Sequence, residues 1–114
     1  MTANHTAQTA WLTVADVAEV IDESVTRVRR MLDEHYLIGS RRDGTFRIPE
    51  IFLVDAKPLS SLRGTIIVLQ DAGFTDDEVV DWLLNHDDTL GRPPIEALLD
   101  GHKSAVRRVA RILA

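Results

Sequence analysis

Hydrophobic residues near the start of the chain recur at the spacing of an α-helix, in two short segments separated by a polar corner. The apolar positions of the first segment are Val14, Val17, Ala18 and Ile21. They follow the i, i+3, i+4, i+7 repeat that places side chains on one face, which predicts a helix over 14–21. Thr13 precedes this helix as a candidate N-cap, and Asp22 follows it at a position where Asp tolerates a positive φ.

A second amphipathic helix is predicted after Ser24, another candidate N-cap. Val25, Val28 and Leu32 turn inward in this prediction, with Met31 beside them. The outward face carries Thr26, Arg27, Arg29, Arg30 and Asp33. A helix that reads a DNA major groove needs an apolar back and hydrogen-bonding groups in front, and Arg binds guanine O6 and N7 through two hydrogen bonds. The alternative is a solvated helix whose arginines serve solubility.

A β-hairpin is predicted next. Two β-prone runs, Tyr36–Ile38 and Thr45–Ile48, flank Asp43-Gly44, which is a strong signal for a tight turn, and Pro49 ends the second run. The basic residues of the hairpin are Arg41, Arg42 and Arg47. A basic hairpin beside such a helix is typical of a wing that contacts phosphate or a minor groove, although it could also be an edge hairpin that only covers the core. Two helices followed by this hairpin predict a winged helix-turn-helix.

The rest of the chain predicts further helices. Residues 50–58 are either a third strand or a connector, and Pro58 bars a continuous helix across them. Residues 59–72 carry a helical stripe that stops at glycine, although a β-branched cluster leaves a strand open there. Thr75 to Glu78 form a capping box that opens a helix to about Asn85, and Pro93-Pro94 suits the start of another.

A last helix is predicted over about 103–113. Its inward residues are Ala105 or Val106, Val109, Ile112 and Leu113, and its outward residues are Arg107, Arg108 and Arg111. We therefore expect a mainly α protein with a small β-hairpin. Its parts are a flexible arm at 1–10, a winged helix-turn-helix at 11–57, here called the head, and a C-terminal helical region at 58–114 packed on the same core.

The net charge of −5 argues against a simple nucleic-acid binder, so the distribution of charge matters. Residues 24–49 hold six arginines against three acidic residues, whereas residues 58–114 hold six basic against nine acidic residues. The acidic residues therefore lie mostly outside the candidate DNA-reading surface. The chain has no cysteine, no apolar run of membrane-spanning length and no signal-peptide pattern at its start. We expect a cytoplasmic protein without a membrane partner.

The residues that could support catalysis are scattered. His86-Asp87-Asp88 is similar to a metal-binding sequence, but no second histidine or acidic cluster is placed to complete a site. Gly64 and Gly91 are isolated and form no phosphate-binding loop, and the serines have no nearby base. We expect neither an enzyme nor a cofactor or metal site.

The sequence also resembles a known group of proteins. The segment L-T-V-A-D-V-A-E at 12–19, the arginine-rich second helix and R-I-P at 47–49 resemble the excisionase-like winged helix-turn-helix group. Residues 10–113 are similar to a narrower family of small actinobacterial DNA-binding proteins, whose founding member is a substrate of a membrane serine/threonine kinase. The shared features include the wing exit at 49–52, Gly73-Phe74-Thr75 and Trp82-Leu83.

This resemblance implies binding of double-stranded DNA through the second helix and the wing, and a regulatory role. The residues to which we assign DNA contacts are Ser24, Thr26, Arg27, Arg29, Arg30, Arg41, Arg42 and Arg47. The resemblance also implies control by a serine/threonine kinase that modifies a threonine of the arm. Thr9 is the candidate because it lies nearest the first helix, where a phosphate would add about −1.5 to −2 charge and repel the duplex.

A second resemblance supports an alternative function. Residues 90–106 are similar to the C-terminal domain of Xre-type antitoxins, where a comparable segment packs against the toxin or the dimer partner. This implies a protein-interaction module that binds a partner protein, or a homodimer, through the C-terminal helices. The other interpretation of the same capping residues is a helix pair that completes the core.

Overall fold

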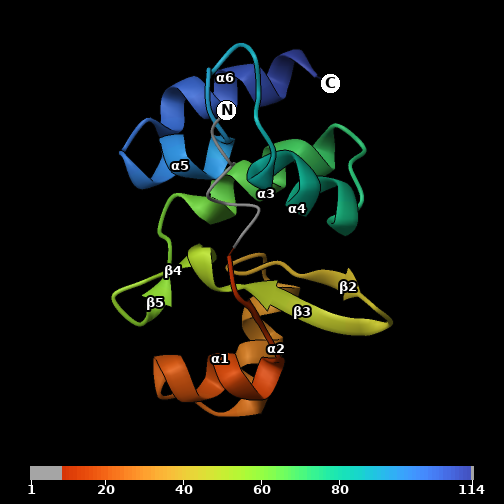
Figure 1. The fold of residues 1–114 in the computed structure, drawn as a ribbon, viewed down its shortest axis with the longest axis vertical. Helices are drawn as coiled ribbons and strands as arrows, with labels where there is room; N and C mark the ends of the chain where they lie inside the picture. The colour runs from red at the N-terminus through yellow and green to blue at the C-terminus, as the bar shows by residue number, and fades with distance from the viewer. Residues whose placement is uncertain (1–8, 114) are drawn as a thin grey trace.

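The fold is mainly helical, with a small sheet between two groups of helices (Figure 1). The computed structural model describes residues 9–113. Within that range the helices are α1 Val14–Ile21, α2 Val25–Asp33, α3 Leu62–Asp71, α4 Asp76–Leu84, α5 Pro94–Leu99 and α6 Lys103–Ile112. The strands are β1 Trp11–Leu12, β2 Ser40–Arg42, β3 Thr45–Pro49, β4 Leu53–Val54 and β5 Lys57–Pro58. Helices α1 and α2 occupy one end of the long axis, and α3 to α6 occupy the other.

Helix α1 begins and ends where the sequence predicts, and α2 begins where it predicts. The Thr13 hydroxyl accepts the Asp16 N–H at 3.0 Å, and the Asp16 carboxylate accepts the Thr13 N–H at 3.1 Å, which together form a capping box. Asp22 ends α1 with a φ of 57°, as predicted. Ser24 caps α2 by accepting the Arg27 N–H at 3.0 Å.

Most of the inward positions are also as predicted. Val17 of α1 and Val28 of α2 are fully buried, and Ala18 of α1 has little exposure. Val25 was expected to face inward, but it is 38% exposed because it lies in the first turn of α2, beyond the contact with α1.

The hairpin β2–β3 turns at Asp43-Gly44 as predicted, with positive φ angles of 54° and 80°. This two-residue turn fixes the register, so that Arg42 pairs with Thr45 and Ser40 pairs with Arg47. The expectation that Tyr36–Ile38 forms the first strand is wrong, because the register assigns that strand to Ser40–Arg42. The run at 36–38 is an irregular segment that buries Leu37 and Ile38, so its β-prone residues serve the core instead of a strand.

A short strand, β1, precedes α1 and was not predicted from the sequence. In β1, Trp11 pairs with Pro49 and Leu12 pairs with Ile48, so β3 is the central strand in the order β1-β3-β2. The pairing extends past the strand, since Glu50 donates its N–H to Ala10 O at 2.8 Å and Ile51 donates its N–H to Thr9 Oγ1 at 3.1 Å. Of the expected flexible arm, residues 1–8 lie outside the described residues.

The connector at 50–58 combines both of the structures that the sequence left open. A 3-10 turn at Glu50–Phe52 leads into the hairpin β4–β5, in which Leu53 pairs with Pro58 and Val54 pairs with Lys57. The side chain of Phe52 is fully buried. Because Phe52 sits at the end of the head and contributes to the common core, it joins the two parts of the chain.

The C-terminal region is a group of four helices, α3 to α6. The β-branched segment within 59–72 is helical in α3, and the predicted capping box at Thr75 and Glu78 opens α4. In α6, Val106, Val109 and Ala110 face the core. Ile112 and Leu113 were expected to face inward but are 74% and 44% exposed, because α6 extends past its packing partners at that end.

One cluster of buried side chains connects all of these elements. It runs from Val17, Val28 and Ile48 in the head, through Phe52, to residues of every C-terminal helix, which include Ile66, Leu83, Ile95, Leu98 and Val106. Polar contacts between the parts add to it: Arg63 of α3 donates to Glu34 O at the end of α2 at 2.8 Å and stacks on Tyr36. The C-terminal region therefore packs against the head and shares one hydrophobic core with it.

Candidate nucleic-acid interface

The outward face of α2 presents polar side chains without competing contacts. Thr26 and Arg30 lie opposite the buried Val28 on the helix, and both are exposed. Among residues 9–113 no ion pair or hydrogen bond engages the side chains of Arg27, Arg29 or Arg30. The Ser24 hydroxyl caps the helix, which places it beside the N-terminal N–H groups of α2. This end of α2 can therefore offer both backbone and side-chain donors to an anion.

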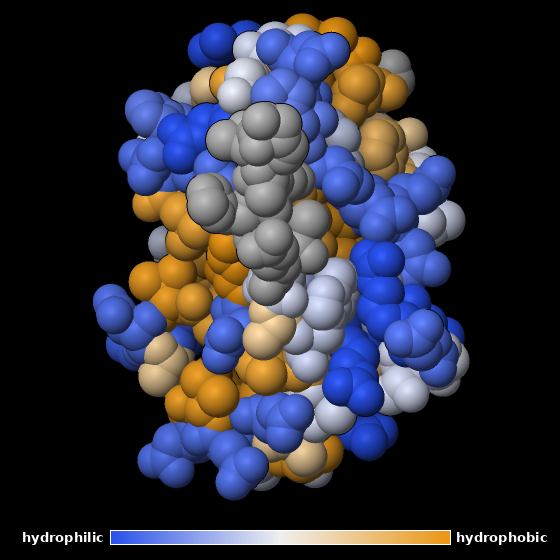
Figure 2. All heavy atoms as spheres, in the orientation of Figure 1, coloured by the Kyte–Doolittle hydropathy of each residue, from blue (hydrophilic) through white to orange (hydrophobic). Residues whose placement is uncertain are grey.

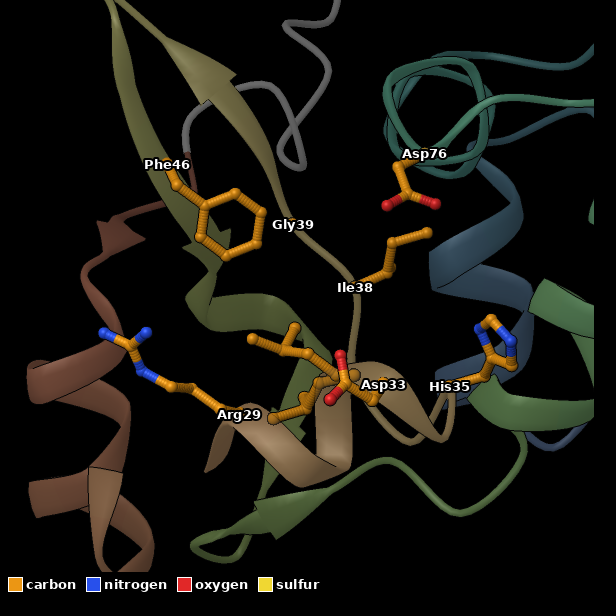
Figure 3. A pocket seen from close by; sticks show the side chains of 9 residues that line it. Arg29, Asp33, His35, Ile38, Gly39, Phe46 and Asp76 are labelled. Carbon is orange, nitrogen blue, oxygen red and sulfur yellow. The ribbon is translucent and has the colours of Figure 1, made fainter. Parts of the chain in front are cut away.

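Arg29 lies on the flank of α2 that faces the hairpin. It lines a groove of about 410 Å³ together with Leu32 and Asp33 of α2, Phe46 of β3 and Asp76 of α4 (Figure 3). Figure 3 shows Arg29 and Phe46 on one side of this groove and Asp76 projecting from α4 on the other. The head therefore contributes both Arg29 and Asp33 to the groove, and α4 of the C-terminal region adds a second carboxylate, that of Asp76.

Arg27 lies on the opposite flank of α2. There it lines a second groove, of about 540 Å³, with Met31, Tyr36 and the residues 57–60 that include β5. Two glutamates, Glu23 and Glu34, line the same groove. Arg27 and Arg29 therefore extend to different sides of the helix, with Thr26 and Arg30 between them.

The hairpin β2–β3 divides its arginines between two faces, because side chains alternate along a strand and directly paired residues share a face. Arg41 pairs with Phe46, which lines the groove beside Arg29, so Arg41 belongs to the face toward α2. Arg42 and Arg47 lie on the other face, where they line a hollow of about 480 Å³ with Trp11 and Thr45. The six arginines between 27 and 47 therefore occupy more than one surface.

Arg42 has partners outside the hairpin. Its Nη2 donates to Asp81 Oδ1 of α4 at 2.9 Å, and its guanidinium lies 4.3 Å from the centre of the Trp11 ring. The two charged side chains are 39% and 57% exposed, so the pair lies at the surface. Arg41 and Arg47 have no ion-pair or hydrogen-bond partner for their side chains within residues 9–113. Figure 2 shows a densely hydrophilic edge where this hairpin and α4 meet.

Trp11 and Asp81 were missed by the sequence reasoning as residues of this surface. Asp81 lies 39 positions from Arg42, and only its place in the exposed row of an acidic helix could have suggested a basic partner. Trp11 precedes a helix cap, and a two-residue strand gives no periodic signal.

The other candidate sites found in the sequence have ordinary surroundings. His86 Nε2 lies 3.4 Å from Asp88 Oδ1 at the surface, and residues 9–113 contain no group of three or more side chains placed to hold a metal. No helix in the described part of the chain is long and apolar enough to span a membrane. The antitoxin-like segment places Pro93, Ile95 and Leu98 in the core, which leaves those side chains unavailable to a partner.

The helices α1 and α2 pack on each other, α2 presents a polar outward face, and a hairpin lies beside α2. This arrangement defines a winged helix-turn-helix protein. The chain belongs to the Rv2175c family. Residues 5–53 match the domain described as "DNA-binding protein Rv2175c, wHTH domain", and residues 59–114 match the "Rv2175c C-terminal domain of unknown function".

Two comparisons, one of sequence and one of structure, agree with this family. The DNA-binding protein Rv2175c of Mycobacterium tuberculosis is 33% identical over 91 residues, which cover 79% of this chain and 59% of that protein. The chain thus spans less than two thirds of the length of this curated relative. The NMR structure of Rv2175c superimposes with a TM-score of 0.85 at 28% identity, covering 94% of this chain and 82% of that one.

Proposed function

We propose that this protein binds double-stranded DNA with sequence preference and acts as a transcriptional regulator. The observation that carries the proposal is the outward face of α2, which is exposed, basic and free of acidic partners among residues 9–113. The buried back of the helix holds this face rigidly beside the hairpin. The name of the Mycobacterium tuberculosis relative, a DNA-binding protein, supports the DNA-binding part of this proposal.

The arrangement supports different roles for α2 and for the hairpin β2–β3. Thr26, Arg29 and Arg30 on α2 would contact base edges in the major groove, with Arg27 reaching from the other flank. The residues that would hold phosphate are Ser24 at the start of α2 and Arg41, Arg42 and Arg47 in the hairpin. A single head of this size reads a short site, so its specificity is modest unless two copies bind adjacent half-sites.

Salt dependence tests whether the affinity comes from a few phosphate contacts. We expect the logarithm of the binding constant to fall linearly with the logarithm of salt concentration, with a slope of about −2.7 to −3.6, as three or four neutralised phosphates give. Fluorescence anisotropy with a labelled duplex at several salt concentrations measures this slope. A binding constant that does not change with salt would contradict binding by the basic face of the head.

We further propose that phosphorylation at Thr9 controls this binding. The Thr9 hydroxyl accepts the Ile51 N–H at 3.1 Å, so a phosphate on Oγ1 would disturb the pairing that extends β1 alongside the residues after β3. It would also add about −1.5 to −2 charge close to the head and repel the duplex.

Incubation with a serine/threonine kinase, followed by peptide mapping by mass spectrometry, tests this site. We expect the modification at Thr9 in the unaltered protein and its loss in Thr9→Val, with weaker DNA binding only for the modified protein. Modification found solely beyond residue 13 would contradict the proposal.

A further inference from the structure

Helix α4 of the C-terminal region has an acidic surface. It lies against the hairpin β2–β3, which carries basic residues of the head. Helix α4 contacts β2, and its acidic residues are Asp76, Asp77, Glu78 and Asp81. Asp76 lines the groove beside Arg29, on the α2 side of the hairpin, whereas Asp81 reaches Arg42 on the opposite face. Negative charge from one helix therefore stands next to both faces of the hairpin.

The contact between Arg42 and Asp81 has the chemistry of an arginine bound to phosphate. A guanidinium N–H donates to an anionic oxygen at 2.9 Å, and the flat face of the guanidinium rests on the Trp11 ring. Both charged groups are accessible from outside. Ion pairs as exposed as this one are weak, so a DNA phosphate that approaches the hairpin can replace the carboxylate.

The remaining donors of Arg42 show that the pair is incomplete. Nη2 contacts Asp81, but Nε is buried and has no hydrogen-bond partner within residues 9–113. A bidentate pair, in which both Nε and an Nη donate to the same anion, is the strong form of this interaction. The Asp81 carboxylate therefore engages Arg42 through Nη2 alone, which is the weaker, single-contact form of this interaction.

We propose that α4 competes with DNA for the hairpin, with the Asp81 carboxylate occupying the position of a backbone phosphate on Arg42. The C-terminal region thereby lowers the affinity of the head and sets how many phosphates it can neutralise. This inference rests on the proposed DNA binding, and it gives the C-terminal region a role within that function. Contact between DNA and Arg42 requires that the link between α4 and the hairpin opens.

The test uses Asp81→Asn, which keeps the shape of the side chain and its carbonyl acceptor but removes the charge. We expect this variant to bind a duplex about three- to fivefold more tightly at moderate salt, the range that corresponds to the loss of one exposed ion pair. The salt slope should become steeper by about one phosphate contact. The matched control is Asp88→Asn in the loop between α4 and α5, which changes the net charge equally. Figure 1 shows this loop extending away from the hairpin.

A double-mutant cycle shows whether the gain acts through Arg42. In the Arg42→Ala background, Asp81→Asn should change neither the affinity nor the salt slope. Thermal unfolding of each variant checks that the folded fraction at the binding temperature is unchanged, since both side chains are largely at the surface.

The possible outcomes separate this inference from the proposed function. If the unaltered protein binds DNA and Asp81→Asn binds equally or more weakly, α4 does not compete and the inference is overturned while DNA binding stands. An equal gain in Asp88→Asn would also overturn it, since the effect would then follow net charge alone. If neither the unaltered protein nor Asp81→Asn binds any duplex, the proposed function itself fails.

Discussion

Replacing Arg30 by alanine is expected to lower the affinity for the preferred DNA site by about 10- to 100-fold, because a bidentate contact to a base discriminates by roughly 1–3 kcal/mol. Arg30 lies opposite the buried Val28, so it points directly away from the core and has no partner within residues 9–113. The loss should be much smaller on unrelated duplexes, since those retain only the phosphate contacts. Selection of preferred sites from a random duplex pool, followed by titration, measures the effect.

Two arginine variants serve as controls for Arg30→Ala. Arg41→Ala should weaken binding to all duplexes by a similar factor, because a phosphate contact does not depend on sequence. Arg108→Ala, on the exposed face of α6 at the other end of the molecule, should leave binding unchanged. If Arg30→Ala reduced the affinity for every duplex equally, α2 would hold phosphate and would not read bases.

Replacing Phe52 by alanine should destabilise the whole protein by about 3–5 kcal/mol, the usual cost of removing a fully buried aromatic side chain. Phe52 joins the head to the C-terminal region within one hydrophobic cluster, so the loss should lower the stability of both parts together. Urea unfolding measures the change in the free energy of unfolding.

The two tryptophans allow each part to be followed separately. Trp11 lies in β1 of the head and Trp82 lies in α4, so the variants Trp11→Phe and Trp82→Phe each leave one fluorescent probe. We expect both probes to report one coincident transition, which Phe52→Ala shifts to lower urea by a similar amount. Leu113→Ala is the matched control at an exposed position and should shift neither. Two separate transitions would contradict a common core.

Local features of the fold are predictable from the sequence because each depends on residues within a few positions. The caps at Thr13, Ser24 and Thr75 are set by hydrogen bonds that span three residues, and the sequence signals for them are direct. The turn at Asp43-Gly44 is equally local, since two consecutive positive φ angles favour these residue types.

Features that depend on distant contacts were not predictable in the same way. The run at 36–38 has the composition of a strand, but burial of Leu37 and Ile38 against other elements determines its conformation. Ile112 at the C-terminal end of α6 shows the opposite error, since it has the residue type of a core position but is 74% exposed. The pairing of Arg42 with Asp81 depends on how α4 packs against β2, which no pattern along the chain records.

The shared interior limits how this protein can be divided or recombined. Removing residues 58–114 would expose hydrophobic side chains of the head that α3 to α6 cover, so the head is poorly suited to transfer into another protein by itself. Fusions and inserted tags are better tolerated in the exposed stretch around Asn85 to Thr89, which separates α4 from α5 without contributing to the interior. An engineered sensor that reports on α4 could be built there while leaving both faces of the hairpin open.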